Sequence, residues 1–288
     1  MNKTLSSKLL VLLKNKHTEF SDKLYFEHPY KYTFYGLDRI LSLYNIETNA
    51  LMLKNKDELL QDTYTVSPDK LHYIPNTIPS MSPKEKANVI DHKGDLKEEL
   101  GILPNERIVL YVGCQAKTKG IYELLQAFER IYHDNLLIRL VIVGEIRDFS
   151  ELVRFIPKSV AHIIYTGLID AKQLRKWYTV ADIGILPTYT EQCSYVGLEM
   201  MKYIGVVVTT DAWGVKDMFQ DGINAIVAPL TYDSCTFVEN LKNAIKRGLT
   251  LREKERKILE TNCLQTLKDK YNTVSMQNSY EQLISSLS

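Results

Sequence analysis

The segment around Glu191 and Glu199 combines two carboxylates with a candidate helix N-terminus. The two glutamates are eight positions apart, and Ser194 between them is a natural N-cap for a helix. Residues 194–197 would then present unpaired backbone N–H groups beside two carboxylates. Carboxylates suit a ligand with many hydroxyls, and backbone amides suit an anionic group. A sugar nucleotide has both kinds of group. For Glu199 alone, a carboxylate that only complements the helix dipole explains the same position.

A second candidate is the loop GCQAKTKG at residues 113–120. It lacks the G-x-G-x-x-G spacing of a dinucleotide fingerprint, and Lys119-Gly120 reverses the Gly-Lys order of a P-loop. What remains is a glycine turn with Lys119 entering a helix N-terminus. That combination can hold a phosphate through free N–H groups and one positive charge. A βα turn with a solvated lysine is the alternative.

Both candidates follow stretches that are typical of buried strands. Short β-branched, apolar runs, most of them bounded by Gly or Pro, predict strands at 107–112, 137–143, 162–165, 182–186, 206–209 and 225–227. Helical patterns alternate with them at 121–132, 171–180, 194–204 and 215–219. We therefore predict an α/β fold with a doubly wound, Rossmann-like domain, in which ligands bind beyond the carboxyl ends of the strands.

The rest of the chain has weaker patterns. The N-terminal part predicts helices, a strand at 39–43, a helix at 48–60 and a strand at 71–74, and residues 80–100 have the composition of a linker. Towards the C-terminus we expect a helix at 237–247 that ends at Gly248, a capping box from Thr250 to Glu253, and a final helix at 273–287.

Composition limits the classes of function. The 288 residues carry a formal net charge of +1, which gives no electrostatic argument for binding nucleic acid. Four cysteines lie far apart without close histidine partners, so neither a zinc site nor a disulfide framework is indicated and a reduced, cytoplasmic protein is expected. No apolar run approaches the roughly 18 residues needed to span a bilayer. We expect a soluble or at most peripheral protein.

Glu191 and Glu199, behind Pro187-Thr188 and a predicted strand, resemble the Glu-x7-Glu motif of retaining GT-B glycosyltransferases of family 4 (glycosyl transferases group 1). The flanking landmarks occur in the family's order. They are Ile74-Pro75-Asn76, Val112-Gly113, Lys119-Gly120, Val143-Gly144, Tyr165-Thr-Gly167, the run from Gly205 to Asp211, Gly214-Val-Lys-Asp217 and Asp221-Gly-Ile-Asn-Ala225. The resemblance covers about residues 39–229 and is specific as a set.

The resemblance implies catalytic roles for Lys119 and Glu191. Lys119 would neutralise the donor diphosphate, and Glu191 would contact the donor sugar. Glu199 would accept hydrogen bonds from ribose hydroxyls, residues near Gly144 and Gly167 would frame the nucleobase, and amides in the segment 194–198 would touch sugar or phosphate. The implied donor-binding set is Gly113, Lys119, Gly144, Gly167, Glu191, Ser194, Tyr195, Val196, Leu198 and Glu199.

The implied reaction is transfer of a sugar from a UDP- or GDP-linked donor to an acceptor hydroxyl with retention of configuration. A lysine and oriented amides can stabilise the leaving diphosphate, so no metal and no cofactor is expected besides the nucleotide-sugar substrate. A glycan, a lipid-linked molecule or a protein would accept the sugar. The third hypothesis is an oxidoreductase on a Rossmann-like fold, but the sequence lacks the glycine fingerprint that such an enzyme uses to bind a dinucleotide.

The chain departs from the family in ways that motivate a second hypothesis. Cys114 replaces an arginine beside the first glycine, which removes a bidentate phosphate clamp. Asp217 replaces a usual glutamate, and Ala225 a frequent glycine. His17 is no convincing match for the family's acceptor-side histidine, and a surface role is the alternative. These departures, with a short N-terminal lobe, also fit a catalytically impaired sugar-nucleotide-binding or partner subunit.

The resemblance also divides the chain. We expect a partial acceptor-side, Rossmann-like lobe at 1–80, because only 75 residues precede Asn76. This lobe would be followed by a linker at 81–104 and a nucleotide-sugar domain at 105–270. A C-terminal helix at 271–288 would then pack back towards the N-terminal lobe. The lysines and leucines of residues 1–16 suit peripheral contact with the inner face of a membrane. Alternatively, these leucines cover the core of the lobe.

Overall fold

The computed structural model describes residues 48–49, 71–72, 74–79, 93–132, 137–191 and 193–286. The chain divides into two units, Met1–Ile74 and Pro75–Ser288. In the first unit, β1 (Thr48–Asn49) pairs in parallel with β2 (Leu71–His72). A strand therefore occupies Thr48–Asn49, where the sequence predicted the start of a helix; both residue types are poor helix formers. The strand predicted at 39–43, His17 and the basic segment 1–16 lie outside the described residues.

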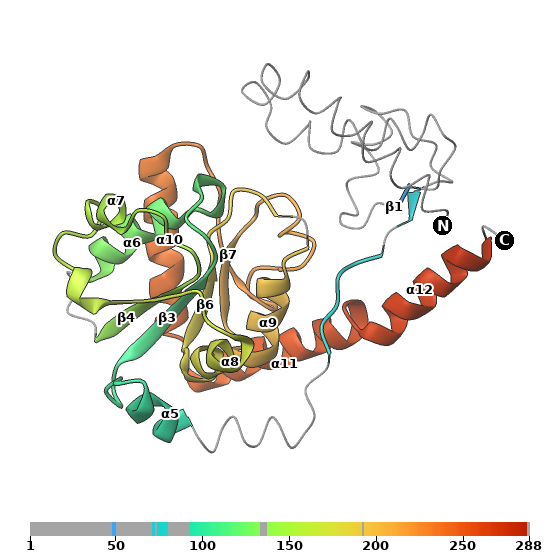
Figure 1. Ribbon diagram of the computed structural model, residues 1–288, viewed down its shortest axis with the longest axis horizontal. Coiled ribbons are helices and arrows are strands. Elements are labelled where there is room, and N and C mark those ends of the chain that lie inside the picture. Colours follow the sequence, from blue (N-terminus) through green and yellow to red (C-terminus); the bar gives the residue numbers. More distant parts are fainter. Residues whose placement is uncertain are drawn as a thin grey trace. The chain divides into compact units, whose positions relative to one another are not determined.

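The second unit is built on a six-stranded parallel sheet, as the alternating pattern predicted (Figure 1). Its strand order is β5-β4-β3-β6-β7-β8, and all five neighbouring pairs are parallel. The strands are β3 (Arg107–Val112), β4 (Ile138–Val143), β5 (Ile163–Gly167), β6 (Ile183–Leu186), β7 (Val207–Thr210) and β8 (Ile226–Ala228). The order reverses between β3 and β6, which creates the topological switch point of a doubly wound sheet.

Helices cover both faces of this sheet, which explains why its strands are apolar on both sides. One layer contains α6 (Ile121–Tyr132) and α10 (Ser234–Leu249), which pack on each other. The other contains α8 (Ala171–Val180), α9 (Tyr195–Tyr203) and α11 (Glu253–Lys270), seen in front of the sheet in Figure 1. Shorter helices are α5 (Lys93–Glu99) and α7 (Phe149–Val153), and the chain ends in α12 (Thr273–Ser286).

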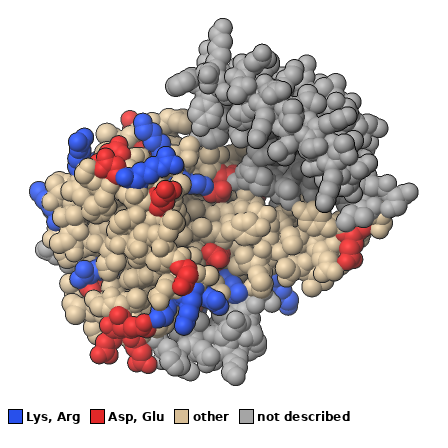
Figure 2. Space-filling model, in the orientation of Figure 1, with Lys and Arg blue, Asp and Glu red and all other residues tan. Residues whose placement is uncertain are grey.

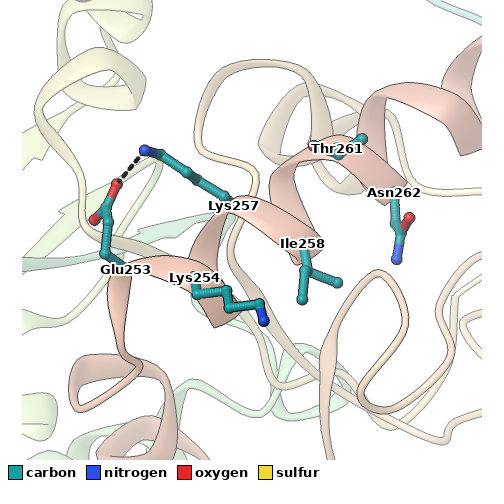
Figure 3. A pocket seen from close by; sticks show the side chains of 6 residues that line it. All are labelled: Glu253, Lys254, Lys257, Ile258, Thr261 and Asn262. Atoms are coloured by element: carbon teal, nitrogen blue, oxygen red, sulfur yellow. Dashed lines mark ion pairs between the residues drawn. The ribbon is translucent and has the colours of Figure 1, made fainter.

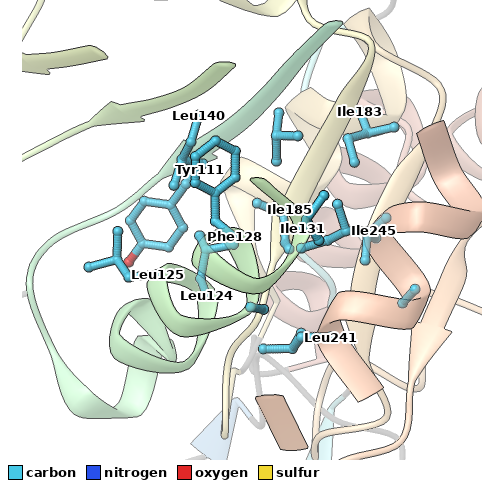
Figure 4. Close-up of a cluster of buried hydrophobic side chains, with 14 of the residues drawn as sticks. Tyr111, Leu124, Leu125, Phe128, Ile131, Leu140, Ile183, Ile185, Leu241 and Ile245 are labelled. Atoms are coloured by element: carbon cyan, nitrogen blue, oxygen red, sulfur yellow. The ribbon is translucent and has the colours of Figure 1, made fainter. Parts of the chain in front are cut away.

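The main hydrophobic core lies between the sheet and the α6–α10 layer (Figure 4). Alternate residues of the strands point into it, and Tyr111 and Ile185 show this for β3 and β6. Phe128 of α6 and Leu241 of α10 enter from the helical side, and both are fully buried. At about 25 cal/mol per Å² of buried apolar surface, this core supplies the main driving force that holds the strand ends in place.

Three local predictions were wrong. Residues 214–218 form turns where a helix at 215–219 was predicted; the Val215 and Met218 amides bond three residues back, to Ala212 O and Val215 O. Gly248 lies inside α10 and does not end it; a Cβ there would approach Ile183 to 3.2 Å, so glycine allows close packing of helix on sheet. At the start of α11 the Arg252 amide donates to Glu255 Oε2 at 2.9 Å, so no box forms from Thr250 to Glu253; the Thr250 hydroxyl instead donates to Lys246 O at the end of α10.

Candidate functional site

The carboxyl ends of β3, β4 and β5 bring three of the predicted glycines to one edge of the sheet. The amide of Gly113 donates to Val143 O at 2.9 Å, and the amide of Gly144 donates to Gly167 O at 3.0 Å. Gly144 has φ 137°, and a Cβ on it would lie 2.1 Å from Gly113 O. Only glycine fits so close an approach of the two backbone segments.

The loops that follow β3 and β6 are pressed together at the switch point. Gly120 has φ 65°, and a Cβ there would lie 1.9 Å from Pro187 O. Thr118 O accepts hydrogen bonds from the Thr188 hydroxyl at 3.0 Å and from the Tyr189 amide at 2.9 Å. Lys119, which ends the short 3-10 turn Lys117–Lys119, is therefore held beside the loop that carries Glu191.

Lys119 and Glu191 form an ion pair in this site. The distance from Lys119 Nζ to Glu191 Oε2 is 2.6 Å, and the two side chains are 33% and 18% exposed. The pair is therefore partly shielded from water but still reachable from solvent. It brings together the two residues predicted to be catalytic, although 72 positions separate them in the chain.

The start of α9 has the cap that the sequence predicted. Ser194 Oγ accepts a hydrogen bond from the Gly197 amide at 3.1 Å. The first helical amides, those of Tyr195 and Val196, have no carbonyl to bond within the helix. Leu198 differs: its amide donates to Ser194 O at 3.0 Å and its side chain is fully buried. The Leu198 amide is thus already bonded within the helix, and its predicted contact with the donor stays a prediction.

Glu199 lies one turn deeper and has a partner that the sequence analysis missed. The Tyr178 hydroxyl donates to Glu199 Oε2 at 2.9 Å, and the Tyr178 ring stacks on Tyr203 with centroids 5.7 Å apart. Burial, and then the adjacent Glu199 carboxylate, hold the pKa of Tyr178 far above its usual value. This tyrosine therefore stays a hydrogen-bond donor that orients Glu199. No pattern in α8 distinguishes it from an ordinary buried tyrosine.

Gln115 is a second residue that the sequence analysis missed. Its Oε1 accepts from the amides of Arg147 and Asp148 at 2.8 and 2.9 Å, and its Nε2 donates to Glu151 at 2.8 Å. Gln115 thereby ties the loop after β3 to the loop after β4. Sequence could not indicate this role, because a single glutamine in a polar loop carries no periodic signal.

Two further groups near the loops differ in what they offer. Burial raises the pKa of the Cys193 thiol to about 11, so Cys193 is protonated at neutral pH and is a poor nucleophile. Asp217, in the turn after β7, has a buried oxygen, Oδ2, without a hydrogen-bond partner among the described residues.

Across the ranges that the structure describes, no group of three His, Cys, Asp or Glu side chains suits a metal ion.

The surface and the helices give three additional observations. A shallow hollow on α11 is lined by Glu253, Lys254, Lys257, Ile258, Thr261 and Asn262, none of which is a predicted site residue (Figure 3). Lys and Arg are interspersed with Asp and Glu over the face in Figure 2. No helix within the described ranges combines the length and apolar character required to cross a bilayer.

The family comparison finds one match. A family model described as "Glycosyl transferases group 1" matches residues 106–247, which contain the six-stranded sheet and every residue of the predicted donor-binding set. Its match begins just before β3 and ends in α10.

Curated relatives match over a similar region. A putative teichuronic acid biosynthesis glycosyltransferase, TuaC of Bacillus subtilis, is 29% identical over 48% of this chain and 33% of its own length. The lipopolysaccharide 1,2-N-acetylglucosaminetransferase of Salmonella typhimurium is 27% identical over 56% of this chain and 44% of its own length. In these matches, the chain spans between a third and a half of the length of the relatives.

Solved structures share the fold at low identity. HepE of Anabaena, crystallised with UDP and glucose, has a TM-score of 0.71 at 16% identity and covers 90% of this chain and 68% of its own. WaaG, a glycosyltransferase involved in lipopolysaccharide biosynthesis, has a TM-score of 0.61 at 17% identity and covers 78% of this chain and 60% of its own.

Proposed function

We propose that this chain transfers a sugar from a nucleotide sugar to an acceptor hydroxyl, starting from the match of residues 106–247 to the model for glycosyl transferases group 1. The observation that carries the proposal is the ion pair of Lys119 with Glu191 at the switch point of the sheet, four residues before α9 begins at Tyr195. The cation and the helix amides suit a diphosphate, and the carboxylate suits the sugar that is joined to it.

In the proposed mechanism, the site stabilises the leaving group. Departure of a nucleoside diphosphate builds negative charge on the β-phosphate, which Lys119 and the amides of Tyr195 and Val196 would stabilise. Glu191, 2.6 Å from Lys119, would contact the donor sugar. Retention would follow from attack on the face of the leaving group, whose phosphate oxygen takes the proton of the acceptor hydroxyl. This chemistry requires neither a metal nor another cofactor.

The remaining site residues would bind the nucleoside. Glu199, oriented by Tyr178, would accept hydrogen bonds from the ribose hydroxyls. Gly113, Gly144 and Gly167, at the carboxyl ends of β3, β4 and β5, would frame the base and the phosphates. Because HepE of Anabaena was crystallised with UDP and glucose, UDP-sugars are the first donors to test, with GDP-sugars as the alternative.

The proposal also assigns the parts of the chain. We infer that 105–270 binds the donor, and that residues 1–80 supply a partial acceptor-side lobe joined by the segment 81–104. The C-terminal segment 271–288 would pack back towards that lobe. A cytoplasmic location, with contact between residues 1–16 and the inner face of a membrane, would bring the site to a lipid-linked or glycan acceptor.

Isothermal titration tests the donor site directly. UDP-glucose, UDP-N-acetylglucosamine and GDP-mannose are titrated into the wild type, Lys119→Ala and Glu199→Ala. We expect one donor to bind and both variants to weaken it by about tenfold, as loss of a hydrogen bond to a charged group predicts. Absence of binding by all three donors, or equal binding by the variants, would refute the assignment. Donor hydrolysis then separates a transferase from a subunit that only binds.

A further inference from the structure

The 75–79 segment, residues Pro75 to Pro79, runs along α9 and reaches α12. At one end of α9, Asn76 Nδ2 donates to Cys193 O at 2.9 Å. At the other end, Lys202 Nζ donates to Pro79 O at 2.7 Å. Thr77 Oγ1 lies 3.5 Å from the sulfur of Met276 in α12. This extended segment is therefore fixed against the same unit that carries the candidate donor site.

Asn76 makes contacts that use both ends of its amide group. Its Nδ2 holds the Cys193 carbonyl, while its Oδ1 accepts a hydrogen bond from the Tyr195 hydroxyl at 3.3 Å. The Cys193 thiol lies 3.9 Å from the main-chain oxygen of Asn76. An amide has one donor side and one acceptor side in the same plane, so asparagine satisfies both partners. Aspartate would set a carboxylate oxygen against the Cys193 carbonyl, and leucine would make neither bond.

These contacts fall on the second half of the loop between β6 and α9, where the Ser194 amide also lies 3.4 Å from the sulfur of Met218. The first half is held elsewhere: the Glu191 amide donates to Trp213 O at 3.2 Å, and the Tyr189 amide donates to Thr118 O. The second half leads from Cys193 into the N-terminus of α9. Asn76 forms hydrogen bonds with this half on both sides of the Ser194 cap, at Cys193 and at Tyr195.

We infer that Asn76 is a positioning residue for the donor site, which aims the first amides of α9 at the sugar diphosphate. The inference rests on the proposed function and deepens it. With the Cys193 carbonyl tied back to Asn76, the peptide planes that follow are restrained, and the amides of Tyr195 and Val196 keep the direction in which the helix leaves them free. A sequence reading of Ile-Pro-Asn marks only the boundary of a lobe and does not indicate this role.

The test compares ligands that do and do not reach these amides. The variants are Asn76→Asp, Asn76→Leu and Tyr195→Phe. The control is Lys202→Met, which acts at the other end of α9, where it removes the hydrogen bond to Pro79 O and the contact of Lys202 Nζ with the Tyr203 ring. Each is titrated with the best-binding donor of the three named above and with its nucleoside monophosphate, which lacks the β-phosphate and the sugar. Steady-state assays of donor hydrolysis or transfer give KM and kcat.

We expect Asn76→Asp and Asn76→Leu to weaken donor binding by about tenfold and to raise KM, with a change of less than about twofold for the monophosphate. Tyr195→Phe, which alters an exposed side chain, should weaken the donor by about threefold, and Lys202→Met should match the wild type. Unchanged donor affinity in the Asn76 variants, or equal weakening of donor and monophosphate, overturns the inference. Failure of the wild type to bind any donor instead overturns the proposed function on which it rests.

Discussion

Glu191→Gln should strengthen the binding of free UDP while weakening the preference for UDP-sugars. In the structure, Glu191 Oε2 lies 2.6 Å from Lys119 Nζ, so the carboxylate already binds the ammonium group that would bind the diphosphate. A diphosphate must compete with Glu191 for this lysine. The amide of glutamine keeps the shape of the side chain and removes its negative charge.

The magnitude follows from the change in the hydrogen bond at Lys119. A hydrogen bond to a charged partner contributes about 1.5–3 kcal/mol, and a neutral one about 1 kcal/mol. Because the Lys119 and Glu191 side chains are 33% and 18% exposed, we take a value in the lower half of the charged range, about 2 kcal/mol. The difference released to the diphosphate is about 1 kcal/mol, or roughly fivefold in Kd. A UDP-sugar gains the same amount but loses the proposed contact between Glu191 and the sugar.

Titration of UDP and UDP-glucose into the wild type and Glu191→Gln gives the ratio of the two affinities. We expect UDP to bind about fivefold more tightly to the variant and UDP-glucose to gain nothing. Glu239→Gln is the matched control, because Glu239 pairs with Arg130 and Lys242 away from the site and should leave both values unchanged. Weaker binding of UDP to Glu191→Gln would contradict the competition between this carboxylate and the diphosphate.

Three further predictions concern orientation, packing and pH. Tyr178→Phe removes the donor to Glu199 and should weaken nucleotide binding by about fivefold in calorimetry, whereas an unchanged Kd would show that Glu199 needs no orientation. Gly120→Ala should lower the unfolding free energy in urea by about 1–3 kcal/mol or more, because its Cβ would meet Pro187 O. The pKa of Cys193 is raised from 9.0 to about 11, so the unfolded state loses its proton first. Stability should therefore fall as pH rises from about 9 to about 11, and fall less in Cys193→Ala; equal slopes would contradict the burial of this thiol.

The strands were predictable because burial on both faces leaves a local record in the sequence. The run from Arg107 to Val112 is almost entirely apolar, and the structure makes it a central strand between β4 and β6. Likewise Ser194 is a cap that acts within its own turn. Features that depend on a few neighbouring residues can be recognised without knowing what lies across from them.

Local patterns failed where a distant surface changed their meaning. Gly248 was predicted to end a helix, but α10 extends to Leu249; a Cβ on Gly248 would lie 3.2 Å from Ile183, so the glycine favours close packing of the helix on the sheet. The segment after β7 has the spacing of a short helix but folds as turns, in which Asp217 keeps a buried oxygen. In both places, packing against the rest of the domain outweighed intrinsic preference.

The sequence by itself determined the strand and helix order, and the placement of its lysine and glutamates after particular strands. Only the tertiary structure decided which of these side chains meet. Lys119 reaches Glu191 because β3 and β6 are neighbours, Tyr178 reaches Glu199 because α8 packs on α9, and Asn76 reaches Cys193 because an extended segment returns to α9. Periodicity reports which face of an element is buried, whereas side-chain partners depend on how sheet order and crossover helices bring distant elements together.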